Sequence, residues 1–359
     1  MIKELLTRTE CTAMRGIAIL AIMLHNYTHW LRGIVKENEY MWYHSKFDQL
    51  WQVVMNPDEL LPMHLLSFFG HYGVPVFLFL SGYGLVRKYE QGSLPEVGLW
   101  RFVRYNYLKL FRIFIVGFAA FVMVDAITPN MHRYLWMEVV AMLGMYANFF
   151  ENPSHVVWPG PYWYFSITLQ LYIFYRLVFY RWRHWGLVVV CMAACCIWQL
   201  YCEGDMVLLE RLRYNLIGGM LPFGMGLLLA RHEQGIIEGC KATTGVSHML
   251  AWLLNLVLAI VFIFWASSAF GYWLFVPALI VWGTIALVKL IPDQVLSYIV
   301  WVGSISAAVF VTHPLVRKII IRPYSQHDLY AGLLLYVVAT IFLSWLFMKL
   351  INKIPAPKL

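Results

Sequence analysis

The run AMRGIAILAIMLHNYTHWL, residues 13–31, decides the fold class of this 359-residue chain. A helix of about 20 apolar residues crosses a hydrocarbon core of ~30 Å, so this run is long enough to span a membrane. It also carries Arg15 near its start and His25 beyond its middle. Because a charged residue at the centre of such a helix costs about 2.5 to 3.5 kcal/mol on insertion scales, we take a functional site as the default hypothesis for this helix.

The rest of the chain has the same apolar character. Hydrophobic residues make up 61% of the sequence and charged residues only 13%, which is far from the composition of a soluble globular domain. We therefore expect an all-α, polytopic transmembrane bundle, and loops too short for a separate soluble unit make residues 1–359 one membrane domain. The predicted spans number about ten: 13–31, 66–86, 105–126, 162–180, 186–202, 213–230, 248–266, 270–290, 297–317 and 329–351.

The segment 134–150 (YLWMEVVAMLGMYANFF) determines the topology. It is shorter than the other spans and contains Glu138. If it lies in the interface or is re-entrant, the basic loops and both termini fall on one side. The positive-inside rule favours this arrangement, with both termini cytoplasmic. We expect a protein of the bacterial cytoplasmic (inner) membrane whose first span stays in place as a signal-anchor.

The formal net charge of +8 follows from the excess of lysine and arginine in the loops on the cytoplasmic side. No basic cluster is accompanied by a soluble binding module, so we expect membrane lipids and no nucleic acid among the partners. We also expect no metal site.

Arg15 and His25 are ten positions apart, which is about 15 Å along a helix. They cannot touch, but they can line one cavity from opposite ends. His29 follows His25 one turn later on the same face. A lone intramembrane histidine is as often a packing residue, whereas an imidazole that titrates near pH 6.5 suits a general base. The residues alone leave both interpretations open.

The second span, HLLSFFGHYGVPVFLFLSGYGL at 64–85, contains glycine and proline and ends near Ser81 and Gly82. Such residues loosen a membrane helix and are tolerated where protein or a cavity satisfies the backbone. Ser81 has no G-x-S-x-G surroundings, so close packing through small residues is favoured over a nucleophile.

A basic stretch follows this span and contains Arg104, Lys109 and Arg112. Ordinary anchoring on the positive side explains part of it. The sharper hypothesis is that Lys109 and Arg112, three positions apart, bind the phosphates of an anionic cofactor.

Two further segments offer substrate contacts. The aromatic run 158–175 holds Trp163 and Tyr164, which belong to an interfacial belt or stack on a sugar ring. Gln170, buried in the same span, needs a partner. His313, near the end of a later span, is a substrate contact or an interfacial residue, and we weigh these equally.

Five motifs together resemble the acyltransferase 3 family of integral membrane enzymes, in order and spacing, from about residue 10 to 350. They are RGIAILAIMLH at 15–25, GVPVFLFLSGYGL at 73–85, KLFRI at 109–113, WYFS at 163–166 and SISAAVFVTH at 304–313.

The resemblance implies transfer of an acyl group, usually acetyl, from cytoplasmic acyl-coenzyme A to a hydroxyl of a carbohydrate or glycolipid acceptor. It assigns the essential histidine to His25 and the first-span arginine to Arg15. It places the serine and glycine of a family motif on Ser81 and Gly82. The chain is similar to the stand-alone class, which has no fused esterase-like domain.

The chain departs from the family pattern at several positions. Leu78 stands where the family has a second phenylalanine, and only Lys109, Arg112 and Ile113 match the basic motif. Where many members have glutamates after the tryptophan, this chain has Thr168 and Leu169. The group that assists His25 is therefore not evident from the sequence.

Two other classes compete with an enzyme. A transporter also needs about ten spans and buried ionisable residues, but its usual internal repeat is absent from the sequence. A polysaccharide-export accessory would carry no catalysis. Binding of acetyl-coenzyme A separates the enzyme from both.

Overall fold

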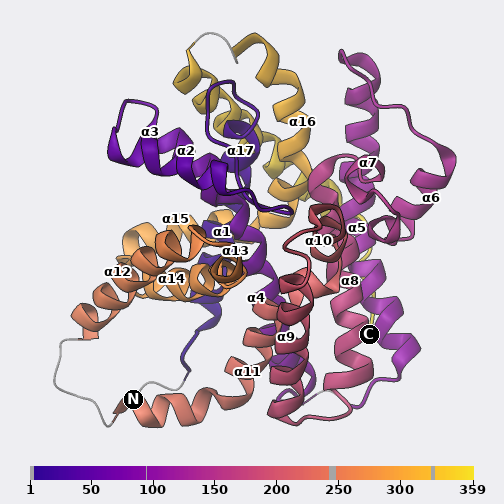
Figure 1. Ribbon diagram of the computed structural model, residues 1–359. Coiled ribbons are helices and arrows are strands. Elements are labelled where there is room, and N and C mark those ends of the chain that lie inside the picture. Colours follow the sequence, from indigo (N-terminus) through magenta and orange to yellow (C-terminus); the bar gives the residue numbers. More distant parts are fainter. Residues whose placement is uncertain (1–3, 94, 242–247, 325–327) are drawn as a thin grey trace.

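The computed structural model describes residues 4–93, 95–241, 248–324 and 328–359, and all of its regular structure is helical (Figure 1). The α-helices are α1 Arg8–Thr28, α2 His44–Met55, α3 Leu61–Phe69, α4 Gly73–Tyr89, α5 Leu99–Ile127, α6 Trp136–Leu143, α7 Pro153–Val156, α8 Trp163–Phe174, α9 Trp185–Leu200, α10 Met206–Tyr214, α11 Leu216–Lys241, α12 His248–Ser267, α13 Phe270–Trp273, α14 Val276–Leu290, α15 Asp293–Ser304, α16 Ser306–Tyr324 and α17 Leu329–Lys353. Short 3₁₀ turns occupy η1 Gly70–Tyr72, η2 Ala147–Phe149 and η3 Gly160–Tyr162, and η4 Tyr175–Phe179 is a π-helix.

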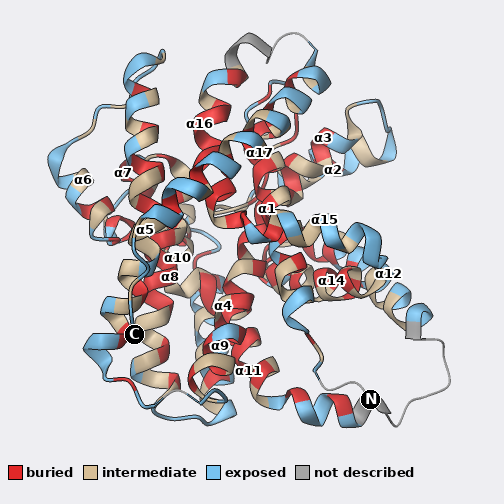
Figure 2. Cartoon of the chain, turned by 180° about the vertical axis from the view of Figure 1, so that it is seen from behind, coloured by how far each residue is buried: buried red, intermediate tan, exposed pale blue. Residues whose placement is uncertain are grey.

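Helix α1 is the centre of the bundle. Thr7 and Glu10 form a capping box at its start: the Thr7 hydroxyl accepts from the Glu10 amide at 3.2 Å, and the Glu10 carboxylate accepts from the Thr7 amide at 2.8 Å. The helix then contacts α3, α4 and α14 to α17. Figure 2 shows buried residues concentrated on α1, α4 and α16, whereas α12 is exposed on its outer side.

Glycines let neighbouring helices approach α1 closely. A Cβ atom on Gly16 would collide with the Ile299 carbonyl oxygen of α15, and one on Gly303 with the Thr12 carbonyl oxygen. Small residues at helix contacts are the usual means of close packing in membranes. These contacts fix α15 against the first half of α1.

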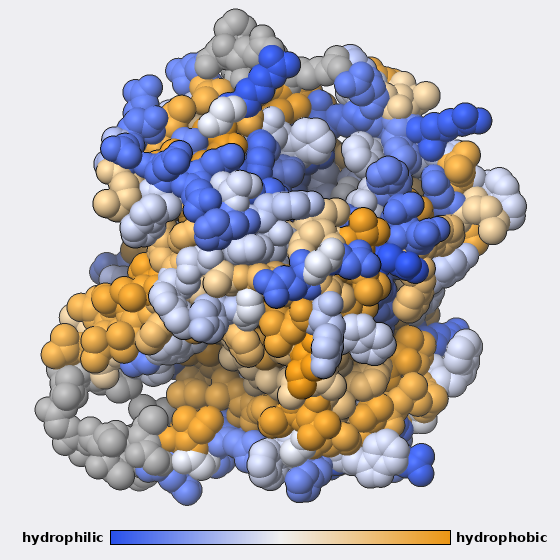
Figure 3. All heavy atoms as spheres, in the orientation of Figure 1, coloured by the Kyte–Doolittle hydropathy of each residue, from blue (hydrophilic) through white to orange (hydrophobic). Residues whose placement is uncertain are grey.

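The two ends of α1 define two sides of the molecule. We call the side of Arg8 the terminal side, because the start of α1 and the C-terminus lie in the lower half of Figure 1, and the side of Thr28 the far side. The loop before α2 and the ends of α16 and α17 that face each other lie at the top of that view. Figure 3 shows an apolar band across the middle and lower part of one face, with hydrophilic residues gathered above it.

Four helical segments of the described chain are long and apolar enough to cross a membrane: 61–89, α5, the 249–267 part of α12, and α17. A fifth is added if the bent pair α15 and α16 counts as one span, and α9 and α14 are shorter apolar helices. The expected number of about ten spans is not confirmed by this measure. Polar residues at both ends of α1, including Arg15 and His25, dilute its apolar stretch.

Two predicted spans are broken. Residues 297–317 were expected to form one span, but α15 and α16 meet at Ile305 with a bend of 71°. The Ser304 hydroxyl donates to the Trp301 carbonyl at 2.6 Å, which competes with continuation of the helix. The predicted span 270–290 is also divided, into α13 and α14, and Pro277 lies in the first turn of α14, where proline is tolerated.

The segment 134–150 holds only α6, with eight residues, and η2. At 1.5 Å per residue, α6 is about 12 Å long, well short of a membrane core. Met145 then takes a positive φ of 56°, which turns the chain between the two elements. Neither element crosses a bilayer, as expected for an interfacial or re-entrant segment.

Candidate active site

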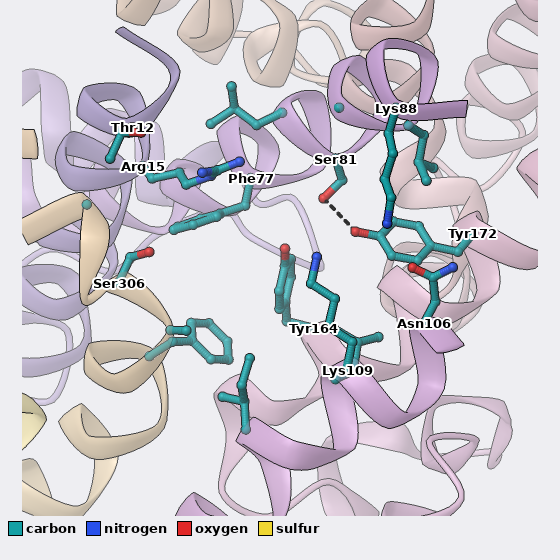
Figure 4. Close-up of a pocket in the computed structure, with 18 of the residues that line it drawn as sticks. Thr12, Arg15, Phe77, Ser81, Lys88, Asn106, Lys109, Tyr164, Tyr172 and Ser306 are labelled. Carbon is teal, nitrogen blue, oxygen red and sulfur yellow. Dashed lines mark hydrogen bonds between the residues drawn. The ribbon is translucent and has the colours of Figure 1, made fainter. Parts of the chain in front are cut away.

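A cavity of about 610 Å³ opens in the terminal half of the molecule (Figure 4). Its walls come from α1, α4, α5, α8 and the junction of α15 with α16. The side chains that carry charge or a hydroxyl into these walls include Arg8, Thr12, Arg15, Ser81, Lys88, Lys109, Tyr164, Tyr172 and Ser306. A volume of this size suits a small-molecule ligand.

Arg15 extends from α1 into this cavity and is exposed there. Among the described residues it has no hydrogen-bond or ion-pair partner. Its neighbour Gly16 packs closely against α15. At this turn, α1 therefore contacts α15 through a glycine, and Arg15 extends into the cavity. A guanidinium in this position needs water or an anionic ligand.

Lys109 reaches the same cavity from α5, beside Tyr164 (Figure 4). Arg112, one turn later, points to the other side of α5, where its guanidinium donates to the Ile351 carbonyl at 2.8 Å and to the Asn352 side chain at 3.2 Å. Arg104 is exposed and does not line the cavity. The expected pairing of Lys109 with Arg112 is therefore absent from this arrangement.

Ser81 and Gly82 of α4 face opposite ways. Ser81 lines the cavity and accepts a hydrogen bond from the Tyr172 hydroxyl at 3.3 Å. Gly82 packs on α11, because a Cβ atom there would collide with the Phe223 carbonyl oxygen. The glycine thus serves helix packing, and the serine faces the cavity.

His25 lies outside this cavity, in the far half of α1, with 4% of its surface exposed. Its Nδ1 is 2.8 Å from the Ser67 carbonyl oxygen. Because a carbonyl only accepts, Nδ1 carries the proton and Nε2 of the neutral ring keeps its lone pair. Gly70 permits the approach, since a Cβ atom there would lie 2.6 Å from the His25 Cβ atom.

Two more histidines surround His25. The His29 and His71 rings lie 5.1 and 5.4 Å from the His25 ring, centroid to centroid. His71 is buried, and neither of its ring nitrogens has a hydrogen-bond partner among the described residues. It borders a small cavity of about 40 Å³ that Glu39 and Arg213 also line.

A second large cavity, of about 630 Å³, lies on the far side, and His29, Trp30, Lys36 and Glu37 are among the residues that line it. The His29 Nδ1 atom is 3.1 Å from the Glu37 carboxylate. Burial alone would raise the pKa of Glu37, but this hydrogen bond and the charges of the nearby histidines hold the pKa below its ordinary value. Glu37 is therefore ionised at neutral pH.

The remaining candidates separate into different surroundings. Trp163 packs against Tyr40 and Tyr214, with ring centroids 5.6 and 5.7 Å away, and borders the small cavity instead of the cavity that Arg15 and Lys109 line. His313 is fully buried, and its ring lies 5.8 Å from that of Phe310, a wall of the large cavity. Its Nε2 has no hydrogen-bond partner in the described chain.

Gln170 has the partners that its burial requires. Its amide donates to the Asn215 side chain at 2.9 Å and accepts from the Leu216 amide at 3.0 Å. These bonds join α8 to the start of α11, so the residue is structural.

One group of side chains has metal-ligating chemistry. His25, His29 and Glu37 each offer one ligand atom, and these atoms lie within 4.8 Å of one another. Nitrogen and carboxylate donors of this kind bind zinc.

The cavity borders one half of α1, and the buried His25 lies in the other half. In a comparison with protein families, the acyltransferase domain model matches residues 10–349. The chain belongs to the acyltransferase 3 family. It is therefore an acyltransferase, and its apolar helices together with the family indicate an integral membrane protein. No curated protein and no solved structure was found to match this chain.

Sequence reasoning missed Glu37 and His71, which the structure places near His25. Glu37 lies in a loop eight residues after His29, and His71 lies in the short turn between α3 and α4. A signal was present for His71, because a histidine between the glycines at 70 and 73 is polar in an apolar run.

Proposed function

We propose that this enzyme moves an acyl group, most simply acetyl, from acyl-coenzyme A in the terminal-side cavity to a hydroxyl of a cell-envelope or exported carbohydrate on the far side. One observation carries the proposal. Arg15 and Lys109, two cations without a protein partner among the described residues, face one cavity inside an apolar bundle. The whole chain then acts as one domain in the cytoplasmic membrane, with both termini in the cytoplasm.

The cavity has the chemistry that a coenzyme A thioester needs. Arg8 and Lys88 add two more cations to its wall, and phosphates bind such donors through charge-assisted hydrogen bonds. The Lys88 ammonium lies 4.3 Å from the Tyr105 ring centroid. Phe77 and Phe310 form an apolar part of the wall, which suits the pantetheine arm and the acyl chain.

His25 is the proposed general base. Its Nε2 removes the proton of the acceptor hydroxyl while the hydroxyl oxygen bonds to the thioester carbon. The carbon–sulfur bond then breaks, and the departing thiolate takes the proton from the imidazolium. A covalent acyl-histidine is the alternative path. Both use Nε2, which the Ser67 contact leaves free.

The acceptor is proposed to enter from the far-side cavity. Trp30, in the wall of this cavity, can stack against a sugar ring. His29 also lines the cavity, and its ring lies 5.1 Å from that of His25. Phe310, in the wall of the donor cavity, has its ring 5.8 Å from that of His313. His313 is near enough to His25 to interact with it electrostatically.

Binding of acetyl-coenzyme A to the detergent-purified protein tests the donor site. We expect Lys109→Ala to raise the dissociation constant about tenfold, which corresponds to 1.4 kcal/mol for one lost contact to a charged group. Arg112→Gln is the matched control, because it removes the same charge one turn away and faces α17. No binding by the wild type, or equal losses in both variants, would contradict the proposal.

A further inference from the structure

The acceptor end of the proposed site contains one carboxylate that no sequence motif indicates. We propose that Glu37 is a positioning residue, which orients His29 and stabilises the positive charge that forms on His25 during transfer. This inference rests on the proposed function of His25, and it assigns the role of the missing acid to the loop between α1 and α2.

The geometry places the carboxylate at the histidine pair. Glu37 is 9% exposed, and its oxygens are 3.1 Å from the His29 Nδ1 atom. One nitrogen of His25, one of His29 and one oxygen of Glu37 all lie within 4.8 Å of one another. At such separations in a poorly solvated site, a negative charge favours a protonated imidazole strongly.

The loop holds Glu37 firmly. The Lys46 ammonium donates to the Glu37 carbonyl at 2.6 Å, and the Lys36 ammonium donates to the carbonyls of His29 and Leu31. Val35, two residues before Glu37, is hydrogen-bonded to α3. Its carbonyl accepts from the Ser67 hydroxyl at 2.7 Å, and its amide donates to the His64 ring at 3.1 Å. Ser67 also supplies the carbonyl that orients His25. Loop and base are therefore positioned by the same turn of α3.

The other charges near His25 do not substitute for Glu37. Arg317 of α16, which donates to the Asn26 side chain at 2.8 Å and lies 4.6 Å from the Trp30 ring centroid, opposes a positive charge on His25. His29, His71 and His313 oppose it as well when they are protonated. Among the described groups whose charges act most strongly on His25, Glu37 is the one that favours a positive charge on the ring.

Glu37 keeps its charge through the reaction. The acceptor proton moves to His25 as the oxygen–carbon bond forms, and the imidazolium gives it to the thiolate once the carbon–sulfur bond is broken. The carboxylate gains and loses nothing, but the intermediate imidazolium is formed beside it. Its removal therefore slows the step that creates the positive charge.

Transfer of [¹⁴C]acetyl from acetyl-coenzyme A to carbohydrate in isolated membranes is the first test. We expect Glu37→Gln to lower the rate at least about tenfold, the effect of losing one hydrogen bond to a charged group. The acidic limb of its pH–rate profile moves to lower pH, because the imidazolium has lost its anion. Glu37→Asp restores part of the rate and the wild-type profile. An unchanged rate, or a change confined to the KM for the acceptor, would overturn the inference.

Asp48→Asn is the matched control. His44 and Asp48 form a second histidine–carboxylate pair on the same side of the molecule, 3.3 Å apart, but both side chains are more than half exposed. Loss of this charge should leave both rate and pH profile unchanged, since solvent screens an exposed pair.

A second measurement does not depend on activity. Diethylpyrocarbonate modifies only a neutral imidazole, and His29 borders the open far-side cavity. We expect modification of His29, followed by mass spectrometry, to be faster in Glu37→Gln than in the wild type, because the Glu37 carboxylate no longer holds the ring through its Nδ1 atom. Equal rates would overturn the pairing even if no acceptor is found. If the wild type binds stoichiometric zinc and Glu37→Gln does not, the three side chains form a metal site, and the proposed positioning role of Glu37 is wrong.

Discussion

The two ionisable residues of α1, Arg15 and His25, have opposite surroundings. Arg15 faces an open cavity and has no hydrogen-bond or ion-pair partner among the described residues. His25 is buried, contacts a backbone carbonyl through Nδ1, and lies near two other histidines and a carboxylate. An exposed cation without a partner suits a ligand that brings its own negative charge. A buried, oriented imidazole suits proton transfer. The contrast predicts separate consequences for changes at each end.

The largest effect is expected at the buried end. His25→Ala should lower acyl transfer about 100-fold or more, the usual contribution of a general base. The measurement is the ester content of envelope carbohydrates in cells that carry either form. His184→Ala is the control, since this histidine lies in an exposed loop. Normal ester content with His25→Ala would remove His25 from the mechanism.

The contact that holds α15 against α1 gives the next effect. Gly303→Leu should strongly destabilise the protein in detergent, because the side chain would occupy the place of the Thr12 carbonyl. We expect a loss of about 2 kcal/mol or more, seen as a lower Tm. Gly235→Ala, in open space on α11, should change Tm little. If the two variants melt alike, α15 does not pack as described.

Some of these residues can be recognised from the local sequence, whereas the positions of others depend on contacts with residues far away in the sequence. Arg15 and His25 stand out in the sequence because a charged or polar residue in an apolar run is a local anomaly, and Lys109 stands out as part of a basic stretch. The direction of Arg112 was not, since it depends on α17, more than 200 residues away. The position of Glu37 depends likewise on bonds from Ser67 and Lys46. Hydropathy did not reveal the bend at Ile305 either, because small residues such as the flanking Ser304 and Ser306 also occur where membrane helices pack closely.

A pH-dependent effect on stability concerns a second acid of the same loop. Burial, and the neighbouring charge of Glu37, raise the pKa of Glu39 to about 8. A carboxyl with a raised pKa in the folded state favours folding while it is protonated, and this contribution is lost as pH rises from about 4.5 to 8. The Tm of Glu39→Gln minus the Tm of the wild type should therefore be larger at pH 8.5 than at pH 5.5. A difference that does not vary with pH would show that Glu39 is ionised throughout.

The most direct test of the division between the two ends measures binding and transfer in the same variants. Purified His25→Ala should bind acetyl-coenzyme A with the wild-type dissociation constant and transfer no acetyl group. Arg15→Ala should bind it about tenfold more weakly, the effect of one lost contact to a charged phosphate. Weakened donor binding in His25→Ala with unchanged binding in Arg15→Ala would contradict the account.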